Sequence, residues 1–328
     1  MGALDGKVAV VTGGGRGIGR EEALLLAAEG ARVLVNDLGV AWDGSPTDER
    51  PAALVAREIQ AEGGTAAANY ADVATPDGAN EMLEQVLDEY GDLDILVNNA
   101  GIVRDGMIFS MTPDAWRSVL EVHVLGHFLP TRAAAVYWRA RAKETVTTPP
   151  HRTLICTSSE SGLFGNAGQT NYDVAKMGLV SLTVAASKEL AKYGVTSNAI
   201  APRARTRMTT ATFIGSGRAH EFDAVDGGFD PMNPANIAPF VAFLASDHAR
   251  AITGQVFILY GGTVARVRLP HIESTIVKDG RWSVSELAER SPELFRSLGP
   301  GHLEGPRGYA RLPGQGASKL TTRQEMRC

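Results

Sequence analysis

The chain has 328 residues, with 32 basic and 37 acidic side chains, a net charge of −5 and a pI near 5.8. Proteins that bind nucleic acid or anionic membranes through bulk charge carry a basic surplus, so the composition argues against both kinds of partner. Hydrophobic residues make up 44% of the chain, enough for a buried core. The only two cysteines, Cys156 and Cys328, exclude a disulfide scaffold and a four-cysteine zinc site, and we expect no metal.

Sorting signals are not evident in the sequence. The first residues, 1–6, lead into an apolar stretch without a basic segment before it. No apolar run reaches the roughly 18 residues that a membrane span needs. The triplet Ser318-Lys319-Leu320 is like a peroxisomal signal, but eight residues follow it. We therefore expect a cytoplasmic protein without a membrane span.

Short apolar runs alternate with segments of helical spacing along most of the chain. In chain order, strands are expected at 8–11, 32–36, 66–70, 94–97, 153–157, 196–200 and 253–259. Helices are expected at 17–29, 52–60, 79–89, 113–141 and 172–192. This alternation predicts an α/β fold, a Rossmann-type doubly wound parallel sheet with helices on both faces.

The composition changes after the last expected strand. Residues 263–328 contain 11 basic and 7 acidic side chains, a charge of about +4, whereas the preceding residues carry about −9. Between residues 296 and 316, nine of 21 residues are Gly or Pro, which is typical of loops. One short helix is expected at 283–294, with Ser283 as N-cap and Glu286 at the third helical position.

These features predict one domain at 1–263 followed by a C-terminal extension at 264–328. The extension is expected to be rich in Gly and Pro and only partly ordered. Its role is not declared by the sequence.

A glycine-rich turn at 12–19 joins the first expected strand to the first helix. Glycines let the backbone approach a pyrophosphate, and the helix that follows offers free N–H groups and a positive end to that anion. A turn of this kind also occurs without any ligand, so its place in the first strand–helix connection is the supporting feature. The candidate cofactor contacts are Gly13, Arg16, Gly17, Ile18 and Gly19.

An acidic residue, Asp37, ends the second expected strand, 18 residues after Gly19. A carboxylate at this point accepts both hydroxyls of an adenosine ribose and repels the extra phosphate of NADP. Arg16 argues the other way, because a basic side chain in the loop can face a 2′-phosphate. The balance favours NAD over NADP, while a purely structural role of Asp37 as a loop cap stays open.

Tyr172 and Lys176 are four residues apart, which places them on one face of a helix. An ammonium near a phenol lowers the phenol's pKa from about 10 toward neutrality. Such a tyrosine can exchange a proton with a substrate hydroxyl or carbonyl, and Ser159 can hydrogen-bond the same oxygen. A single Tyr–Lys pair is more often a solvated helix face, so the prediction depends on the combination of motifs.

Together with Asn98-Asn99-Ala100-Gly101 after the fourth expected strand, these motifs resemble the short-chain dehydrogenase/reductase family over roughly residues 4–262. The resemblance implies hydride transfer between a nicotinamide cofactor and a substrate carbon. It implies that Lys176 binds the nicotinamide ribose and tunes Tyr172, and that the long helices pair two or four copies of the chain. The remaining implied cofactor contacts are Asp72, Val73, Asn99, Ala100, Gly101 and Pro202.

Two departures from the usual family pattern point to one branch. His123 stands where the family usually has the Asn of a proton relay, and Pro202-Arg203 replaces the common Pro-Gly. Both are similar to the D-3-hydroxyacyl-CoA dehydrogenase module of peroxisomal multifunctional enzyme type 2, also called 17β-hydroxysteroid dehydrogenase type 4, and to its actinobacterial homologues. His123 is a candidate catalytic residue, with simple helix packing as the open alternative. His127 is expected at the helix surface.

The segment after the sixth expected strand is a candidate substrate region. Arg203, Arg205 and Arg207 are expected either to meet the phosphates of coenzyme A or to form surface or subunit ion pairs. Residues 208–233 are expected to form a mobile lid over an acyl or sterol group. The apolar members of that lid are Met208, Phe213, Phe222 and Met232.

The leading prediction is NAD-dependent oxidation of a secondary alcohol, with a 3-hydroxyacyl-CoA, steroid-derived acyl chains included, as the substrate class. Two alternative enzymes remain open, a free hydroxysteroid dehydrogenase and an NADPH-dependent 3-oxoacyl reductase. A non-catalytic dinucleotide-binding regulator is the alternative of a different class. The complete set of Ser159, Tyr172 and Lys176 argues against that regulator.

Overall fold

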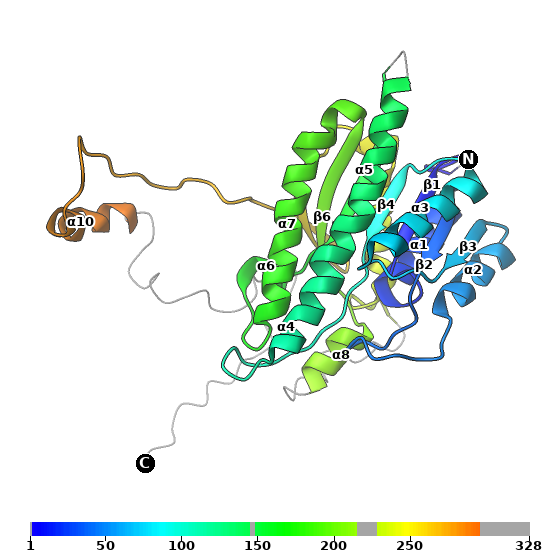
Figure 1. The fold of residues 1–328 in the computed structure, drawn as a ribbon, viewed down its shortest axis with the longest axis horizontal. Coiled ribbons are helices and arrows are strands. Elements are labelled where there is room, and N and C mark those ends of the chain that lie inside the picture. Colours follow the sequence, from blue (N-terminus) through cyan, green and yellow to red (C-terminus); the bar gives the residue numbers. More distant parts are fainter. Residues whose placement is uncertain (1, 145–147, 215–227, 296–328) are drawn as a thin grey trace.

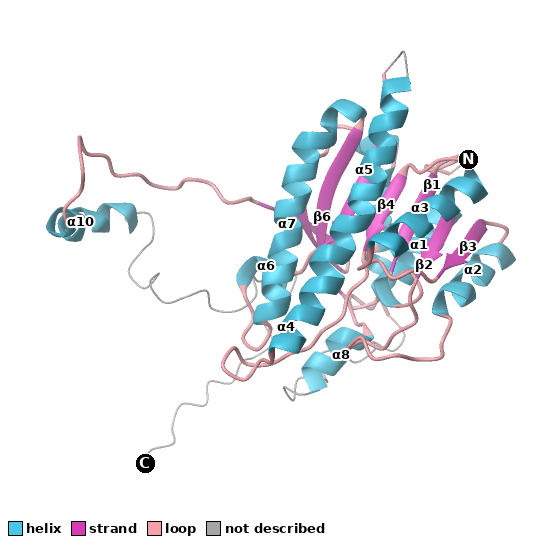
Figure 2. Cartoon of the chain, viewed as in Figure 1, coloured by secondary structure: helices cyan, strands magenta, loops and turns pink. Residues whose placement is uncertain are grey.

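The computed structural model describes residues 2–144, 148–214 and 228–295, with the backbone alone for 211–214. Within these residues one sheet has the strand order β3-β2-β1-β4-β5-β6-β7-β8 (Figure 1), with helices on both faces (Figure 2). All neighbouring strands are parallel except β7 and β8. The predicted doubly wound α/β fold is confirmed. The strands are β1 (Val8–Thr12), β2 (Arg32–Asn36), β3 (Thr65–Asn69), β4 (Ile95–Asn98), β5 (Arg152–Thr157), β6 (Val195–Arg203), β7 (Val256–Tyr260) and β8 (Thr263–Val267).

The helices form two layers against the sheet. Helices α1, α2 and α9 pack on one face, and α3, α5 and α7 pack on the other. The described helices are α1 (Gly17–Ala28), α2 (Pro51–Ala61), α3 (Pro76–Tyr90), α4 (Pro113–Leu120), α5 (Gly126–Glu144), α6 (Glu160–Phe164), α7 (Thr170–Leu190), α8 (Arg207–Ile214), α9 (Ala238–Ala245) and α10 (Val284–Arg290).

The central strands are buried on both faces because helices cover each side of the sheet. In β1 all five residues are buried, which explains its continuous apolar run. Successive side chains of a strand point to opposite faces. Accordingly, Ala9 and Val11 join the core under α1, whereas Val8 and Val10 join the core under α5.

The long helix expected at 113–141 is interrupted. Helix α4 passes into a π-helical turn at Glu121–Leu125, and α5 continues from Gly126. The Gly126 N–H donates to the Glu121 carbonyl, five residues earlier. Such single π-turns occur mostly inside α-helices and often at functional sites. The additional residue in the π-turn changes which side chains of α5 face the core.

The C-terminal part of the sheet extends further than the expected strands. Strand β8 pairs antiparallel with β7 and begins at residue 263, where the sequence placed the end of the domain. The short helix α10 is confirmed, and Ser283 and Glu286 form the expected capping box. The Gly/Pro-rich stretch at 296–316 and the triplet Ser318-Lys319-Leu320 lie outside the described residues.

Two features, membrane-spanning helices and metal-binding side-chain groups, concern here the part of the chain that the structure describes. No helix there is long and apolar enough to cross a bilayer. No group of three or more His, Cys, Asp or Glu side chains there is placed to hold a metal ion.

Candidate active site

The predicted site residues lie at one edge of the sheet. All of them except Tyr172 and Lys176 on α7 and His123 in the π-turn follow or end a parallel strand. The carboxyl ends of parallel strands meet at the same edge, where open α/β sheets bind their ligands. The glycine turn follows β1, Asp37 follows β2, Asp72 and Val73 follow β3, Asn99 to Gly101 follow β4, Ser159 follows β5, and Pro202 lies at the end of β6.

The glycine turn is packed too closely for side chains. A Cβ on Gly13 would lie 2.8 Å from the Ala100 Cα, and a Cβ on Gly19 would lie 2.4 Å from the Gly13 carbonyl oxygen. Gly17 has a φ of +54°, a left-handed conformation that side chains disfavour. Glycine is therefore required here by the fold itself, before any ligand is considered.

Asn99 stabilises the glycine turn through hydrogen bonds, a role that the sequence did not reveal. Its side-chain amide donates to the carbonyls of Thr12 and Gly13, both at 3.2 Å. The Thr12 hydroxyl in turn accepts from the backbone N–H groups of Asn99 and Ala100 at 3.0 and 3.2 Å. The turn after β1 and the segment after β4 are thus one hydrogen-bonded unit.

The N-terminus of α1 is suited to an anion. Its N-cap residue, Arg16, provides no side-chain hydrogen bond to the helix, so the first N–H groups are not capped by a side chain. The Arg16 guanidinium instead pairs with Glu49 and donates to the Val40 carbonyl at 3.4 Å. Ile18 packs against the core beneath the helix. The glycine cradle and this helix end fit the pyrophosphate of a dinucleotide.

Asp37 faces the glycine turn. One carboxylate oxygen accepts from the Gly15 N–H at 3.0 Å, and the other accepts from the Gly39 N–H at 2.8 Å. Farther along the edge, Asp72 accepts from the Ala74 N–H at 2.9 Å and Val73 is buried. These bonds hold both acidic side chains in fixed positions at the carboxyl edge of the sheet.

Lys176 is a buried cation beneath Tyr172. It is 2% exposed, and its ammonium donates to the Thr157 carbonyl at 2.6 Å. The Lys176 nitrogen lies 5.4 Å from the centre of the Tyr172 ring. Burial lowers the pKa of Lys176 from 10.5 to about 7. The pair therefore has the proximity that electrostatic tuning of a phenol requires.

Ser159 is placed by the packing of α6 against α7. It is the N-cap of α6, and its hydroxyl accepts from the Ser161 N–H at 3.2 Å. A Cβ on Gly162 would lie 2.6 Å from the Lys176 Cβ, so only glycine permits this close approach of the two helices. This packing of α6 on α7 fixes the position of Ser159 relative to α7, the helix that carries Tyr172.

His123 lies in the π-turn and is wholly buried. Its Nε2 is 2.8 Å from the Ile102 carbonyl oxygen, and its ring meets the Tyr172 ring edge-on at 5.2 Å between centroids. Burial, reinforced by the charge of Lys176, lowers the pKa of His123 well below 6.5. A Cβ on Gly101 would lie 2.4 Å from the His123 Cε1, which explains that glycine.

The expectation for His127 is wrong, because this side chain is completely buried and does not lie at the helix surface. The π-turn that precedes it adds one residue to the turn and rotates α5 toward the sheet. The Asn98 side-chain amide donates to the His127 carbonyl at 3.3 Å. Burial also lowers the pKa of His127 well below 6.5.

Two of the three arginines after β6 form ion pairs. Arg203 makes a bidentate pair with Glu160 at 2.8 and 2.9 Å, and Arg205 pairs with Asp230. Arg207 begins α8 and is exposed. Of the expected lid, Met208 is half-buried and Met232 is buried. Phe222 and the side chain of Phe213 lie outside what the structure describes.

Comparisons with known proteins identify the family of the chain. The model of the short chain dehydrogenase family matches residues 7–214. Hydroxyacyl-CoA dehydrogenase ChsB1 of Mycobacterium tuberculosis is 44% identical over 298 residues, which cover 90% of this chain and 91% of that protein. Peroxisomal multifunctional enzyme type 2 of Drosophila melanogaster is 41% identical over 74% of this chain, which matches 37% of that enzyme.

A solved structure is similar over nearly the whole molecule. The crystal structure of a short chain dehydrogenase from Mycobacterium avium is 41% identical, with a TM-score of 0.78 and coverage of 95% of this chain and 100% of that chain. The chain therefore belongs to the short-chain dehydrogenase/reductase family and to the branch that contains the peroxisomal multifunctional enzymes, and it is an oxidoreductase that acts on CH–OH groups.

Proposed function

We propose that this protein oxidises the 3-hydroxyl of an acyl-CoA thioester to the 3-oxo group with NAD as the oxidant. The observation that carries the proposal is the buried Lys176 ammonium, 5.4 Å from the ring of Tyr172 at the carboxyl edge of the sheet. The similarity to hydroxyacyl-CoA dehydrogenase ChsB1 supports the substrate class.

In the proposed reaction Tyr172 takes the proton of the substrate hydroxyl. Lys176 in its protonated form favours the phenolate through its charge, and Ser159 donates a hydrogen bond to the substrate oxygen. A dinucleotide held by the glycine turn and the N-terminus of α1 would supply the acceptor for the hydride that leaves the substrate carbon. Burial disfavours the charged form of His123, so we assign this residue to the support of Tyr172 through edge-on packing.

The preference for NAD is supported by two fixed charges. Asp37 is anchored by two backbone N–H groups and presents negative charge where the extra phosphate of NADP would lie. Arg16, which could attract that phosphate, is already paired with Glu49. A 2′-phosphate would meet the carboxylate and would compete with Glu49 for the guanidinium.

Recognition of coenzyme A is assigned to Arg207. The other two arginines of this segment are engaged with Glu160 and Asp230, whereas Arg207 is exposed at the start of α8. A guanidinium at this position can bind a phosphate group in bidentate fashion.

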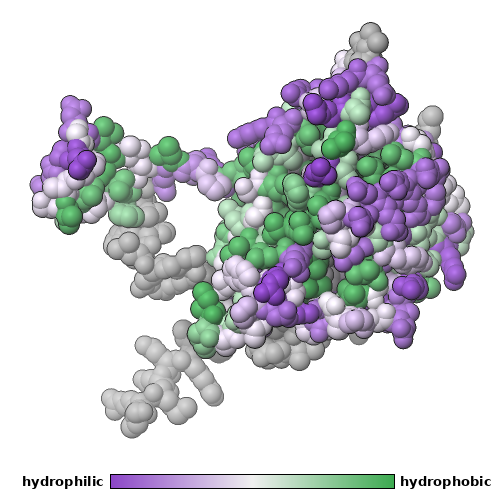
Figure 3. Space-filling model, viewed as in Figure 1, coloured by the Kyte–Doolittle hydropathy of each residue, from purple (hydrophilic) through white to green (hydrophobic). Residues whose placement is uncertain are grey.

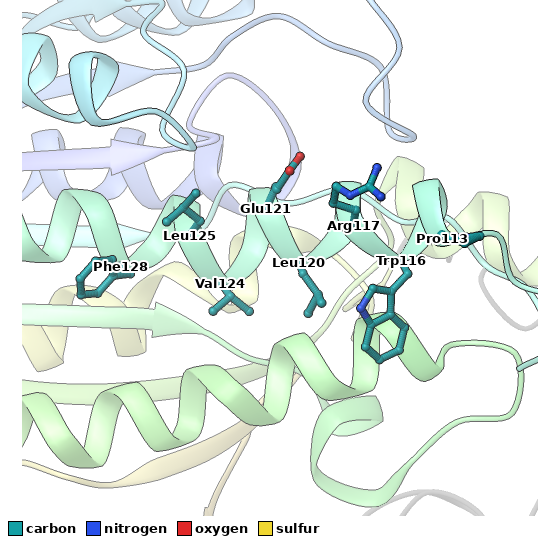
Figure 4. A pocket seen from close by; sticks show the side chains of 8 residues that line it. All are labelled: Pro113, Trp116, Arg117, Leu120, Glu121, Val124, Leu125 and Phe128. Carbon is teal, nitrogen blue, oxygen red and sulfur yellow. The ribbon is translucent and has the colours of Figure 1, made fainter.

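Self-association through the long helices is the remaining part of the proposal. A hollow of about 490 Å³ along α4, the π-turn and α5 is lined by apolar side chains together with Arg117 and Glu121 (Figure 4). A contiguous patch of exposed apolar side chains on a protein surface marks an interaction site. We assign this face to a second copy of the chain. The lining residues are Pro113, Trp116, Arg117, Leu120, Glu121, Val124, Leu125 and Phe128.

Steady-state rates on a panel of substrates test the function. We expect the highest kcat/KM with NAD and 3-hydroxyacyl-CoA thioesters, and much lower values with NADP or with free hydroxysteroids. A preference for free sterols, or a faster NADPH-linked reduction of 3-oxoacyl thioesters, would overturn the substrate and cofactor assignment. No turnover with either dinucleotide, despite binding, would indicate a non-catalytic protein.

A further inference from the structure

The first turn of α7 is capped in an unusual way beside Tyr172. The N–H groups of a first helical turn have no acceptor within the helix, and the N-cap residue, Gln169, provides no side-chain hydrogen bond to them. The Gln169 amide instead donates to the Asp105 carboxylate at 3.1 and 3.2 Å. The Tyr172 N–H donates to the side-chain oxygen of Asn171 at 2.8 Å. Asn171 therefore satisfies the backbone of the residue that is proposed to accept the proton.

Asn171 is a buried junction between α7 and two other parts of the chain. Its side-chain amide donates to the Arg104 carbonyl, which follows β4, at 3.0 Å and to the Ala115 carbonyl of α4 at 3.2 Å. Asn171 is completely buried, and Figure 3 shows apolar side chains gathered over α4, α5 and α7, the helices of this region. Water therefore does not compete for these hydrogen bonds, which are stronger in such surroundings.

Residues 99–104, which we call the bridge segment, connect this junction to the glycine turn. At the start of the segment, the Asn99 amide donates to two carbonyls of the glycine turn. At its end, the Arg104 carbonyl accepts from Asn171. A short stretch of backbone thus joins the half of the site that would hold a dinucleotide to the half that carries Tyr172.

The loop after β2 holds the bridge segment from the cofactor side. The Trp42 carbonyl accepts from the Val103 N–H at 3.1 Å, and the Asp43 carbonyl accepts from the Arg104 guanidinium at 3.0 Å. The same guanidinium donates to Asp114 of α4 at 2.9 Å. Because β1 lies between β2 and β4 in the sheet, this loop crosses the carboxyl end of β1, where the glycine turn begins. The bridge segment is therefore fixed along its length and not only at its two ends.

We propose that Asn171 is a positioning residue, which holds Tyr172 in register with the glycine turn through the bridge segment. This assignment rests on the proposed role of Tyr172 as the proton acceptor. The hydride and the proton leave one CH–OH group, so the phenol must keep a defined distance from the cofactor site, and a displacement of about 1 Å can cost about 10²-fold in rate. Because Asn171 is completely buried, it acts through the placement of Tyr172 and not by contact with the substrate.

A double-mutant cycle on the full chain tests the proposal. Asn171→Ala should lower kcat by about 10- to 100-fold, with an NAD affinity in titration calorimetry within about twofold of the wild type. In the Tyr172→Phe protein the same substitution should cause no further loss, because its effect passes through the phenol. A further loss of the same size in that protein would overturn the positioning role. Full turnover of Tyr172→Phe alone would refute the proposed function, and the positioning role with it.

Asn198 provides a matched control for the loss of a buried amide. It is also completely buried; its amide donates to the Ile252 carbonyl at 2.7 Å, and its oxygen accepts from the Gln255 N–H at 3.1 Å. Asn198→Ala should lower the thermal stability as Asn171→Ala does, but should keep the kcat of the wild type. A similar loss of kcat in both variants would show that general destabilisation, and not the placement of Tyr172, causes the effect.

A surface variant tests the bridge segment without a change in the core. Arg104→Met removes the guanidinium bonds to Asp43 and Asp114 from a side chain that is 33% exposed. In the cofactor-free protein, hydrogen–deuterium exchange should become about tenfold faster in the bridge segment and in the first turn of α7, and kcat should fall severalfold. Arg250→Met, which removes an exposed ion pair elsewhere, should change neither. Unchanged exchange at the first turn of α7 in Arg104→Met would contradict the proposal.

Discussion

The two halves of the site are built in different ways. The turn after β1 depends on the absence of side chains, since Gly13 and Gly19 have no room for a Cβ. The segment around Tyr172 depends on side chains that are buried and carry charge, above all Lys176. The first half thus works through shape and the second through electrostatics. Substitutions in the glycine turn should weaken dinucleotide binding, whereas those near Tyr172 should affect turnover and its dependence on pH.

The substitution Tyr172→Phe should separate the two halves most sharply. Removal of the phenol eliminates the proposed proton acceptor, and kcat should fall by about 10²- to 10⁴-fold. NAD affinity, measured by fluorescence titration, should stay nearly constant because the glycine turn is untouched. Tyr193→Phe, in the short 3₁₀ turn that follows α7, is the matched control and should keep full activity. Retained turnover in Tyr172→Phe would show that another group transfers the proton.

The substitution Gly19→Ala should have the opposite pattern. Its Cβ would press against the Gly13 carbonyl at 2.4 Å and against the Asn99 amide at 2.5 Å, so the turn must shift. Overpacking of this kind costs about 1–3 kcal/mol, and we expect NAD binding to weaken roughly tenfold to a hundredfold. Gly262→Ala, with nothing within 4 Å of the added Cβ, is the control. Isothermal titration calorimetry measures the NAD affinity of both variants. An affinity of Gly19→Ala equal to that of the wild type would argue against a tight pyrophosphate cradle.

The stability of the cofactor-free protein should report the buried charge of Lys176. The pKa of Lys176 is about 7 in the folded protein and 10.5 in the unfolded chain, so between these pH values only the unfolded chain binds the proton. The free energy of unfolding therefore rises with pH across this window. The destabilisation caused by burying Lys176 reaches its full value below about pH 7. Relative to Lys176→Met, wild type should gain about 2 kcal/mol between about pH 7.5 and 9.5 in urea unfolding. An equal difference at both pH values would show that Lys176 is not desolvated.

The substitution Asp37→Asn should have the smallest effect. It removes the negative charge but keeps an oxygen that can accept from Gly15 or Gly39. We expect the ratio of kcat/KM for NAD to that for NADP to fall by about tenfold, mainly through a lower KM for NADP. An unchanged ratio would show that Asp37 serves only to fix the turn.

Features that depend on local pattern were predictable from the sequence. The continuous apolar residues of β1, the glycine turn and the spacing of Tyr172 and Lys176 each follow from chain geometry and point to the observed edge of the sheet. The capping box at Ser283 is another local signal, and the structure confirms it. In each case the residues that decide the feature are neighbours in the chain.

Features that depend on distant contacts were not predictable. The π-turn at Glu121–Leu125 has no distinct composition, and regular helical spacing without it places His127 on the helix surface. The Asn99 bonds to the glycine turn join segments more than 80 residues apart. The pairing of Arg203 with Glu160 likewise joins β6 to α6, and a run of arginines alone cannot show which one is engaged. Strand β8 was missed because its alternating side chains are only half covered.

The most direct test of the central claim is a crystal structure of the protein with NAD and a 3-hydroxyacyl-CoA bound. The account predicts the Tyr172 hydroxyl at about 2.6–3.2 Å from the substrate 3-oxygen, with Ser159 on the same oxygen and Lys176 beneath the phenol. A substrate oxygen held by other groups, with the Tyr172 hydroxyl beyond hydrogen-bond distance, would contradict it.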